Sequence, residues 1–142
     1  MKVVPDANIV IGFFRNPESQ GGFASRTPRQ LVYMSSVVAL ELYAGCRTHR
    51  REMLLANFLK PFEKAGRLIL PDHASFLEAG RVLAKLGDDG IGLTHRRQIV
   101  NDVLIAVTAA RAGMVVVTRN INDFSLIERY VAMRWMLPAQ PQ

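Results

Sequence analysis

The chain has 142 residues, of which 49% are hydrophobic, and it carries a formal net charge of +6. This length and apolar content suit one compact domain with a real core, so we expect a single domain over residues 1–142. The sequence has no signal-peptide pattern and no apolar run long enough to span a bilayer, and its one cysteine excludes an internal disulfide, so we expect a soluble cytoplasmic protein that does not bind a membrane.

Strand and helix patterns alternate through the first half of the chain. In order they predict a strand over 2–4, a helix over 8–14, a strand over 31–35, a helix over 37–46 with Ser36 as its N-cap, and a helix over 49–64. Residues 16–30 are rich in Pro, Gly, Ser and Gln, which indicates an exposed loop or a short helical hairpin that could border a site.

The alternation continues in the second half. The patterns predict a strand over 67–70, a helix over 72–86, a loop that ends at Gln98, a helix over 101–112 closed by Gly113, a strand over 114–118, a helix over 120–127 and an edge strand over 131–136. Strands that alternate with helices predict an α/β fold, a three-layer α/β/α sandwich with a mainly parallel central sheet.

Four carboxylates lie in apolar stretches where a charge is expensive to place: Asp6, Glu41, Asp102 and Asp123. Three of them head an i, i+3, i+4, i+7 apolar stripe and Glu41 lies inside one, so all four should point inward. Carboxylates that share a site repel one another unless a cation lies between them, which indicates a divalent metal. Helix capping is the alternative, because Asp is a favoured N-cap, but capping does not explain Glu41 in the middle of a helix.

The residue types around these acids limit the chemistry. A site of carboxylates without His or Cys at ligand spacing favours Mg²⁺ or Mn²⁺ over zinc. His49, His73 and His95 follow no metal motif and are expected at the surface or in local hydrogen bonds. The sequence contains no phosphate-binding loop, Ser-His-Asp order or Cys-His pair, which leaves metal-assisted phosphoryl transfer.

The excess of positive charge comes mostly from arginine and favours a polyanionic partner, with a solvated basic surface as the alternative. Arginine matches the geometry of phosphate groups, and two clusters are paired: Arg50 with Arg51, and Arg96 with Arg97.

Four segments, PDANIVIGFF, SSVVALELYAG, NDVLIAVTAARAG and VVTRNINDF, resemble the successive signatures of PIN-domain ribonucleases, and more closely those of VapC-type toxins of toxin–antitoxin pairs. They cover nearly the whole chain in the family's order. The resemblance implies a PIN-like fold, with Asp6, Glu41 and Asp102 as metal-binding and catalytic acids and Asp123 as the fourth.

The same resemblance implies auxiliary roles for polar residues beside the acids. Asn8 and Ser36 match positions that orient the acids, and Thr118 and Asn120 match polar positions of the last signature. Many relatives carry an acid at the position of Asn120, so either Asp123 alone is the fourth ligand, or three acids suffice with Asn120 as a neutral ligand.

The family implies hydrolysis of RNA with Mg²⁺ or Mn²⁺, a homodimer, and an antitoxin protein that blocks the groove. Arg15, Arg26, Arg29 and Arg119 are candidate RNA-binding residues. One alternative is a degenerate PIN-like module that binds RNA or a protein without cleavage. Another is a phosphoreceiver-like signalling domain, which is disfavoured because the first strand leads to a lone acid and arginine, not lysine, follows Thr118.

Overall fold

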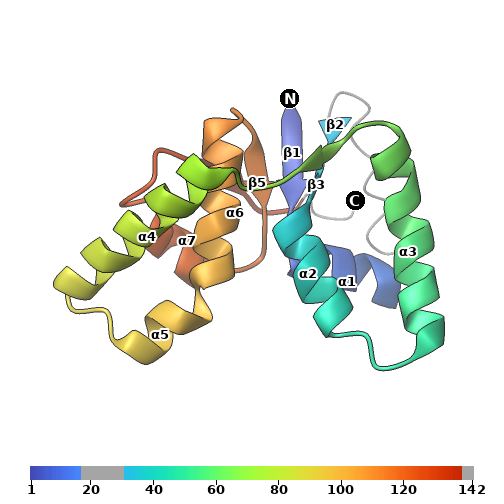
Figure 1. Ribbon diagram of the computed structural model, residues 1–142, viewed down its shortest axis with the longest axis horizontal. Coiled ribbons are helices and arrows are strands. Elements are labelled where there is room, and N and C mark those ends of the chain that lie inside the picture. The colour runs from blue at the N-terminus through green and yellow to red at the C-terminus, as the bar shows by residue number, and fades with distance from the viewer. Residues whose placement is uncertain (17–30, 139–142) are drawn as a thin grey trace.

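The computed structural model describes residues 1–16 and 31–138 (Figure 1). Its main sheet is parallel, in the order β2-β1-β5-β6. The four strands are β1 (Lys2–Pro5), β2 (Leu31–Val32), β5 (Val115–Val117) and β6 (Arg134–Met136). A second, two-stranded parallel sheet joins β3 (Met34–Ser35) to β4 (Leu68–Ile69). The predicted parallel α/β/α architecture is confirmed.

Helices cover the main sheet on both sides. In Figure 1, α4, α5, α6 and α7 lie to the left of β1, and α1, α2 and α3 lie to its right. Their bounds are α1 (Ala7–Arg15), α2 (Ser36–Ala44), α3 (His49–Lys64), α4 (His73–Asp88), α5 (Leu93–Gln98), α6 (Val100–Arg111) and α7 (Ile121–Ile127). None of the described helices is both long and apolar enough to cross a membrane.

The centre of the sheet holds the core because its strands are short runs of valine. Val4 and Val116 are fully buried and are aligned in the β1–β5 pair. Helix α6 packs its apolar residues against this layer, and Val103, Ile105 and Val107 have no exposed surface. Burial of such side chains typically stabilises a fold by roughly 1.5–3 kcal/mol each.

Proline at the end of the central strand is tolerated because of the register. The backbone N–H of Asp6 donates to the Val117 carbonyl (2.8 Å), which continues the β1–β5 ladder one residue past Pro5. Alternate residues of a strand point their N–H groups to opposite neighbours, so the missing N–H of Pro5 faces the β2 side. Strand β2 ends at Val32, opposite Val3, so no bond is lost there.

Three local predictions were wrong. The predicted strand over 31–35 is two short strands in different sheets, because Met34 donates to the Arg67 carbonyl instead of continuing beside β1. The N-cap of α2 is Ser35, whose Oγ accepts from the N–H groups of Val37 (3.1 Å) and Val38 (3.4 Å). The predicted loop before Gln98 contains α5. The predicted loop or hairpin over 16–30 lies, apart from Asn16, outside the described residues.

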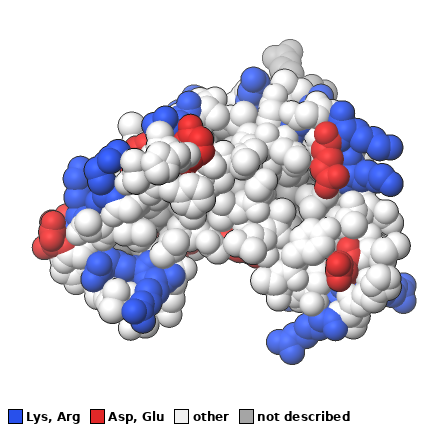
Figure 2. Space-filling view, viewed as in Figure 1, with Lys and Arg blue, Asp and Glu red and all other residues white. Residues whose placement is uncertain are grey.

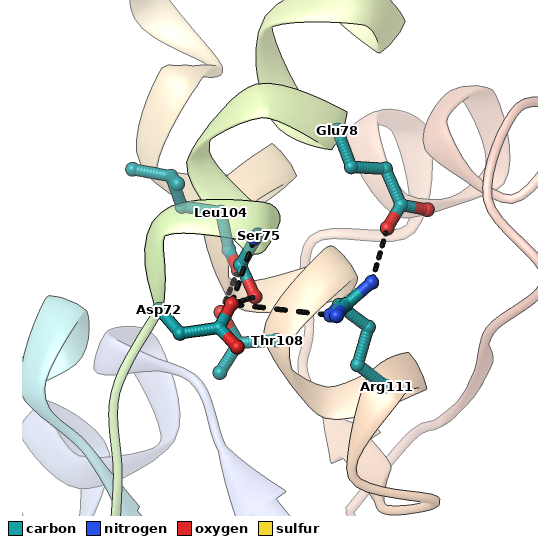
Figure 3. A network of polar contacts seen from close by, with 6 residues as sticks. All are labelled: Asp72, Ser75, Glu78, Leu104, Thr108 and Arg111. Carbon is teal, nitrogen blue, oxygen red and sulfur yellow. Dashed lines mark hydrogen bonds and ion pairs between the residues drawn. The ribbon is translucent and has the colours of Figure 1, made fainter.

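A polar network fixes the end of α6 that is remote from Asp102 (Figure 3). Asp72 is the N-cap of α4 and accepts from the backbone N–H (2.8 Å) and Oγ (2.7 Å) of Ser75. Arg111, at the end of α6, lies 4.0 Å from Asp72 and 3.5 Å from Glu78. These contacts join α4 to α6 and leave the positive charge of Arg111 balanced.

Candidate functional site

An open cleft of about 420 Å³ lies at the carboxyl ends of β1 and β5. All four predicted acids line it: Asp6, Glu41, Asp102 and Asp123. The other lining residues are Ala7, Asn8, Ile11, Gln98, Asn101 and Asn120. The sequence therefore gathers side chains from five helices or their caps into one polar cleft, at the sheet edge where open α/β folds bind ligands.

Asp6 follows β1 directly and is the N-cap of α1, with Oδ1 accepting from the Ala7 N–H (2.8 Å). Its Oδ2 accepts from Thr118 Oγ1 (2.8 Å) and Asn8 Nδ2 (3.0 Å). Burial nevertheless raises its pKa, against these hydrogen bonds, and the nearby charge of Asp123 adds to the rise. Asp6 therefore both caps α1 and lines the cleft.

Glu41 lies in the middle of α2 and reaches the cleft from the side opposite α6. Its Oε1 is buried and has no hydrogen-bond partner within the described residues. Burial raises its pKa, the charge of Asp6 adds to the rise, and a hydrogen bond with Asn101 opposes it. An ionised oxygen without a partner is costly to bury, so this position needs either a proton or a cation.

Asp102 lies in the first turn of α6, but it is not the cap, because Ile99 occupies that position and makes no side-chain cap bond. The capping alternative is therefore wrong for Asp102. Burial raises its pKa to about 7, and the charges of Asp6, Glu41 and Asp123 add to the rise in that order. Near neutral pH this carboxyl is close to half-protonated when no cation is present.

Asn120 connects the last two acids. Its Nδ2 donates to Asp102 Oδ2 (3.2 Å) and Asp123 Oδ2 (2.9 Å), and it is also the N-cap of α7. Asp123 is therefore not the cap of that helix. The amide places a neutral donor between two carboxylates.

Asn8 and Thr118 act as supports for Asp6. Besides the bonds to Asp6, Asn8 Nδ2 lies 3.3 Å from Thr118 Oγ1, and Asn8 Oδ1 accepts from the Arg119 N–H (3.2 Å). Thr118 Oγ1 also accepts from the Asn120 N–H (3.0 Å). These contacts tie the ends of β1 and β5 together and fix the orientation of the Asp6 carboxylate.

Sequence reasoning missed three polar residues in or beside the cleft. Gln98 and Asn101 line it, and His95 Nε2 lies 3.2 Å from Asp123 Oδ1. The prediction of a local hydrogen bond for His95 agrees with this contact, although its partner was not foreseen. The spacing of His95, Gln98 and Asn101, three residues apart, is a helical signal that the neighbouring glycines concealed.

Other predicted site residues lie elsewhere. Ser36 is exposed in the first turn of α2, outside the cleft lining, and its neighbour Ser35 makes the cap bonds. Arg15, at the end of α1, and Arg119 are exposed and do not line the cleft. Arg26 and Arg29 lie outside the described residues.

The donor set suits a hard cation, although the side chains are not gathered around one point. No group of three or more Asp, Glu, His or Cys side chains in the described ranges could hold an ion together as placed. Mg²⁺ commonly uses only one or two protein carboxylates and keeps several waters. The unpartnered Oε1 of Glu41 and the raised pKa values of Asp6, Glu41 and Asp102 fit a site that a cation would stabilise.

A model of the PIN domain family matches residues 3–129. The chain belongs to the PIN domain family, which confirms the family predicted from its four segments. A comparison with curated protein sequences gives no significant match.

Solved structures share this fold over almost the whole chain. The DNA-bound VapBC structure from Salmonella typhimurium is 24% identical, with a TM-score of 0.71, and the match covers 98% of this chain and 99% of that chain. VapBC-1 from nontypeable Haemophilus influenzae is 20% identical, with a TM-score of 0.66 and coverage of 96% and 97%. VapBC-5 from Mycobacterium tuberculosis is 18% identical, with a TM-score of 0.59 and coverage of 96% and 98%.

Proposed function

We propose that this protein is a metal-dependent endoribonuclease in which Asp6, Glu41, Asp102 and Asp123 form the catalytic centre. The observation that carries the proposal is the cleft itself, where four carboxylates meet and three have raised pKa values from burial and mutual repulsion. Carboxylates kept together against their repulsion are typical of sites that act through a divalent cation.

Mg²⁺ or Mn²⁺ bound by these acids would polarise the phosphate, activate water for attack on phosphorus and stabilise the leaving oxygen. The residues of the chain prepare the cleft for this ion. Thr118 and Asn8 hold the Asp6 carboxylate in one orientation. Asn120 separates Asp102 from Asp123 and donates to both, and thereby limits their repulsion.

The test is cleavage of total cellular RNA by the purified chain with Mg²⁺ or Mn²⁺ and with a chelator. We expect discrete fragments that require the metal, and a loss of at least about a hundredfold in rate for Asp6→Asn and Asp102→Asn, because each removes charge that acts in the transition state. Asp88→Asn, at the exposed C-terminal end of α4 and outside the cleft lining, is the matched control and should cleave normally.

Two results would contradict this proposal. Cleavage that persists in the Asp6→Asn and Asp102→Asn proteins would place the activity elsewhere. RNA binding without cleavage by folded, metal-supplied protein would favour the non-catalytic PIN-like module.

We also propose that the chain is the toxin of a type II toxin–antitoxin pair and forms a homodimer. The support is the likeness in fold to VapBC complexes, one of them described as a member of the VapBC family of toxin–antitoxin systems. Expression of the wild-type chain should arrest bacterial growth, whereas the Asp6→Asn chain at equal levels should not. Equal growth of both strains would contradict the toxin role, and a monomer in light scattering at working concentration would contradict the dimer.

A further inference from the structure

The phosphates of a nucleic acid that approaches the cleft are repelled by the carboxylates that line it. Four carboxylates line the cleft, and no Lys or Arg is among the lining residues that the structure describes. A strand of phosphates therefore needs positive charge on surfaces just outside the cleft, and those charges must not already be paired with acids. This requirement can be compared with the positions of the basic side chains.

Two elements that border the cleft carry such charge. On one side, α5 contributes Gln98 to the lining and His95 to the contact with Asp123, and its Arg97 is exposed. On the other side, α2 contributes Glu41, and the turn into α3 follows one helical turn later. That turn and the start of α3 carry three exposed arginines: Arg47, Arg50 and Arg51.

Figure 2 shows both groups in one view. Basic side chains gather over α5 at the lower left and around the turn from α2 to α3 at the lower right, with a hollow between these two protrusions. We call Arg97 the α5 rim, and Arg47, Arg50 and Arg51 the turn rim. The two groups of basic side chains lie on opposite sides of this hollow.

None of the described contacts gives the rim arginines a structural role. Among the described residues, the Lys and Arg ion pairs all involve Arg111, far from the cleft. Arg96, next to Arg97, is held by a bond to the Ile91 carbonyl (2.9 Å) and packs on Gly87, where a Cβ would lie 2.8 Å from its guanidinium. The first turn of a helix is also unfavourable for cations, so Arg50 and Arg51 do not stabilise α3.

We propose that the two rims clamp the backbone of an RNA strand on both sides of the cleft, so that the phosphodiester between them faces the four acids. This inference rests on the proposed ribonuclease function and adds the residues that position its substrate. Arginine suits the task because its planar fork pairs with phosphate through two hydrogen bonds, without reading the base.

The test is equilibrium binding of fluorescently labelled single-stranded RNA oligomers in EDTA, measured by anisotropy across a range of KCl concentrations. EDTA separates binding from catalysis. The variants are Arg97→Gln, the triple Arg47→Gln/Arg50→Gln/Arg51→Gln, and their combination. The matched control is Lys60→Gln/Lys64→Gln/Arg81→Gln, which removes the same charge as the triple from exposed positions on α3 and α4 outside the cleft lining.

Salt dependence is given by the slope of log association constant against log KCl concentration. Loss of the α5 rim should make this slope shallower by about 0.7, and loss of the turn rim by about 2, because each phosphate contact to a single strand contributes roughly 0.7. The effects should add in the combined variant, and the control should match the wild type. Arg97→Lys should keep the wild-type salt slope, because it keeps the charge, and should lose part of the affinity, because it lacks the planar fork.

Oligomer length distinguishes a two-sided clamp from two separate patches. Affinity should rise in a step once the RNA is long enough to reach both rims, and each rim variant should remove that step. For cleavage measured over a range of RNA concentrations, the rim variants should raise KM and leave kcat within about twofold, as expected for loss of binding shared by the ground and transition states.

A wild-type salt slope in the combined variant would overturn the clamp, as would the absence of any length step. Retained RNA binding together with lost binding of a protein partner would overturn it in favour of a protein-docking surface. RNA binding that depends on the rims without metal-dependent cleavage would contradict the nuclease function alone, whereas normal cleavage with rim-independent binding would contradict the clamp alone.

Discussion

Asp102 lowers the stability of the chain in the absence of a cation. Its folded-state pKa of about 7 lies well above the ordinary value of 3.8, so the folded protein keeps a proton that the unfolded chain has already released. Between about pH 4 and pH 7 the folded state binds more protons, and the free energy of unfolding therefore falls as pH rises through that window. Asp6 and Glu41, with raised pKa values, act in the same direction.

Asp102→Asn should therefore stabilise the metal-free protein at neutral pH by on the order of a few kcal/mol, and should flatten its stability between about pH 4.5 and pH 7.5. Urea unfolding in EDTA at several pH values measures both effects. Asp88→Asn, with its exposed side chain, should follow the wild-type curve. Identical curves for Asp102→Asn and wild type would contradict the raised pKa.

Asn120→Asp tests the neutral position between two acids. The change removes an amide that donates to Asp102 and Asp123 and adds a third charge beside them. In EDTA at pH 8 we expect a loss of about 1–3 kcal/mol in the free energy of unfolding, the usual result when bonded polar groups lose their donor. Mn²⁺ should recover more stability in this variant than in wild type.

The exposed neighbour Asn122 provides the control for that experiment, because Asn122→Asp adds the same charge on the same helix. If both variants lost equal stability, the bridge through Asn120 would have no special role.

At the scale of the elements, the start of α2 depends on which of two adjacent serines caps it. Ser35→Ala removes an Oγ that accepts from two buried N–H groups and should destabilise the protein by about 1 kcal/mol. Ser36→Ala alters an exposed first-turn side chain and should change stability by less than about 0.5 kcal/mol. Thermal unfolding of both variants measures these losses of stability. A larger loss for Ser36→Ala than for Ser35→Ala would indicate that Ser36 is the cap.

The elements that the sequence predicted correctly have long or continuous apolar runs, as in α6 and β5. Helix α5 has no buried residue, so its pattern held no apolar signal to set against Gly90 and Gly92. The end of β2 at Val32 could not be predicted for a different reason. It depends on a bond from Met34 to Arg67, a partner distant in sequence that no local pattern contains.

The same reasoning explains which residues of the candidate site could be predicted from the sequence. The acids could be found because a charge at an apolar position of a helix is unusual. Gln98 and Asn101 could not, because a polar residue near the end of a helix ordinarily faces water. Their place in the cleft follows only from the way α5 packs against α6 and α6 packs against α2.

For the whole molecule, metal binding should be linked to folding. A cation held by the folded cleft alone should raise the unfolding temperature in a concentration-dependent way, equivalent to about 2.7 kcal/mol at a hundred times Kd. The effect should shrink as pH falls below about 6, since protons compete for the raised-pKa acids. Differential scanning fluorimetry with Mg²⁺ and Mn²⁺ measures it.

Asp102→Asn should reduce this thermal shift strongly, and Asp88→Asn should leave it unchanged. A shift of the same size in all three proteins would indicate general ionic stabilisation and no site in the cleft.

The central strand of the sheet comes first in the chain, and its partner comes near the end. Val3 to Pro5 pair with Val115 to Val117, and Asp6 takes its bond from Thr118, 112 residues later. During synthesis the ribosome therefore releases β1 long before β5 exists, and contacts of such long sequence separation form late. An incomplete chain has no assembled cleft, so under the proposed ribonuclease function a nascent or truncated copy should not cleave the RNA from which it is translated.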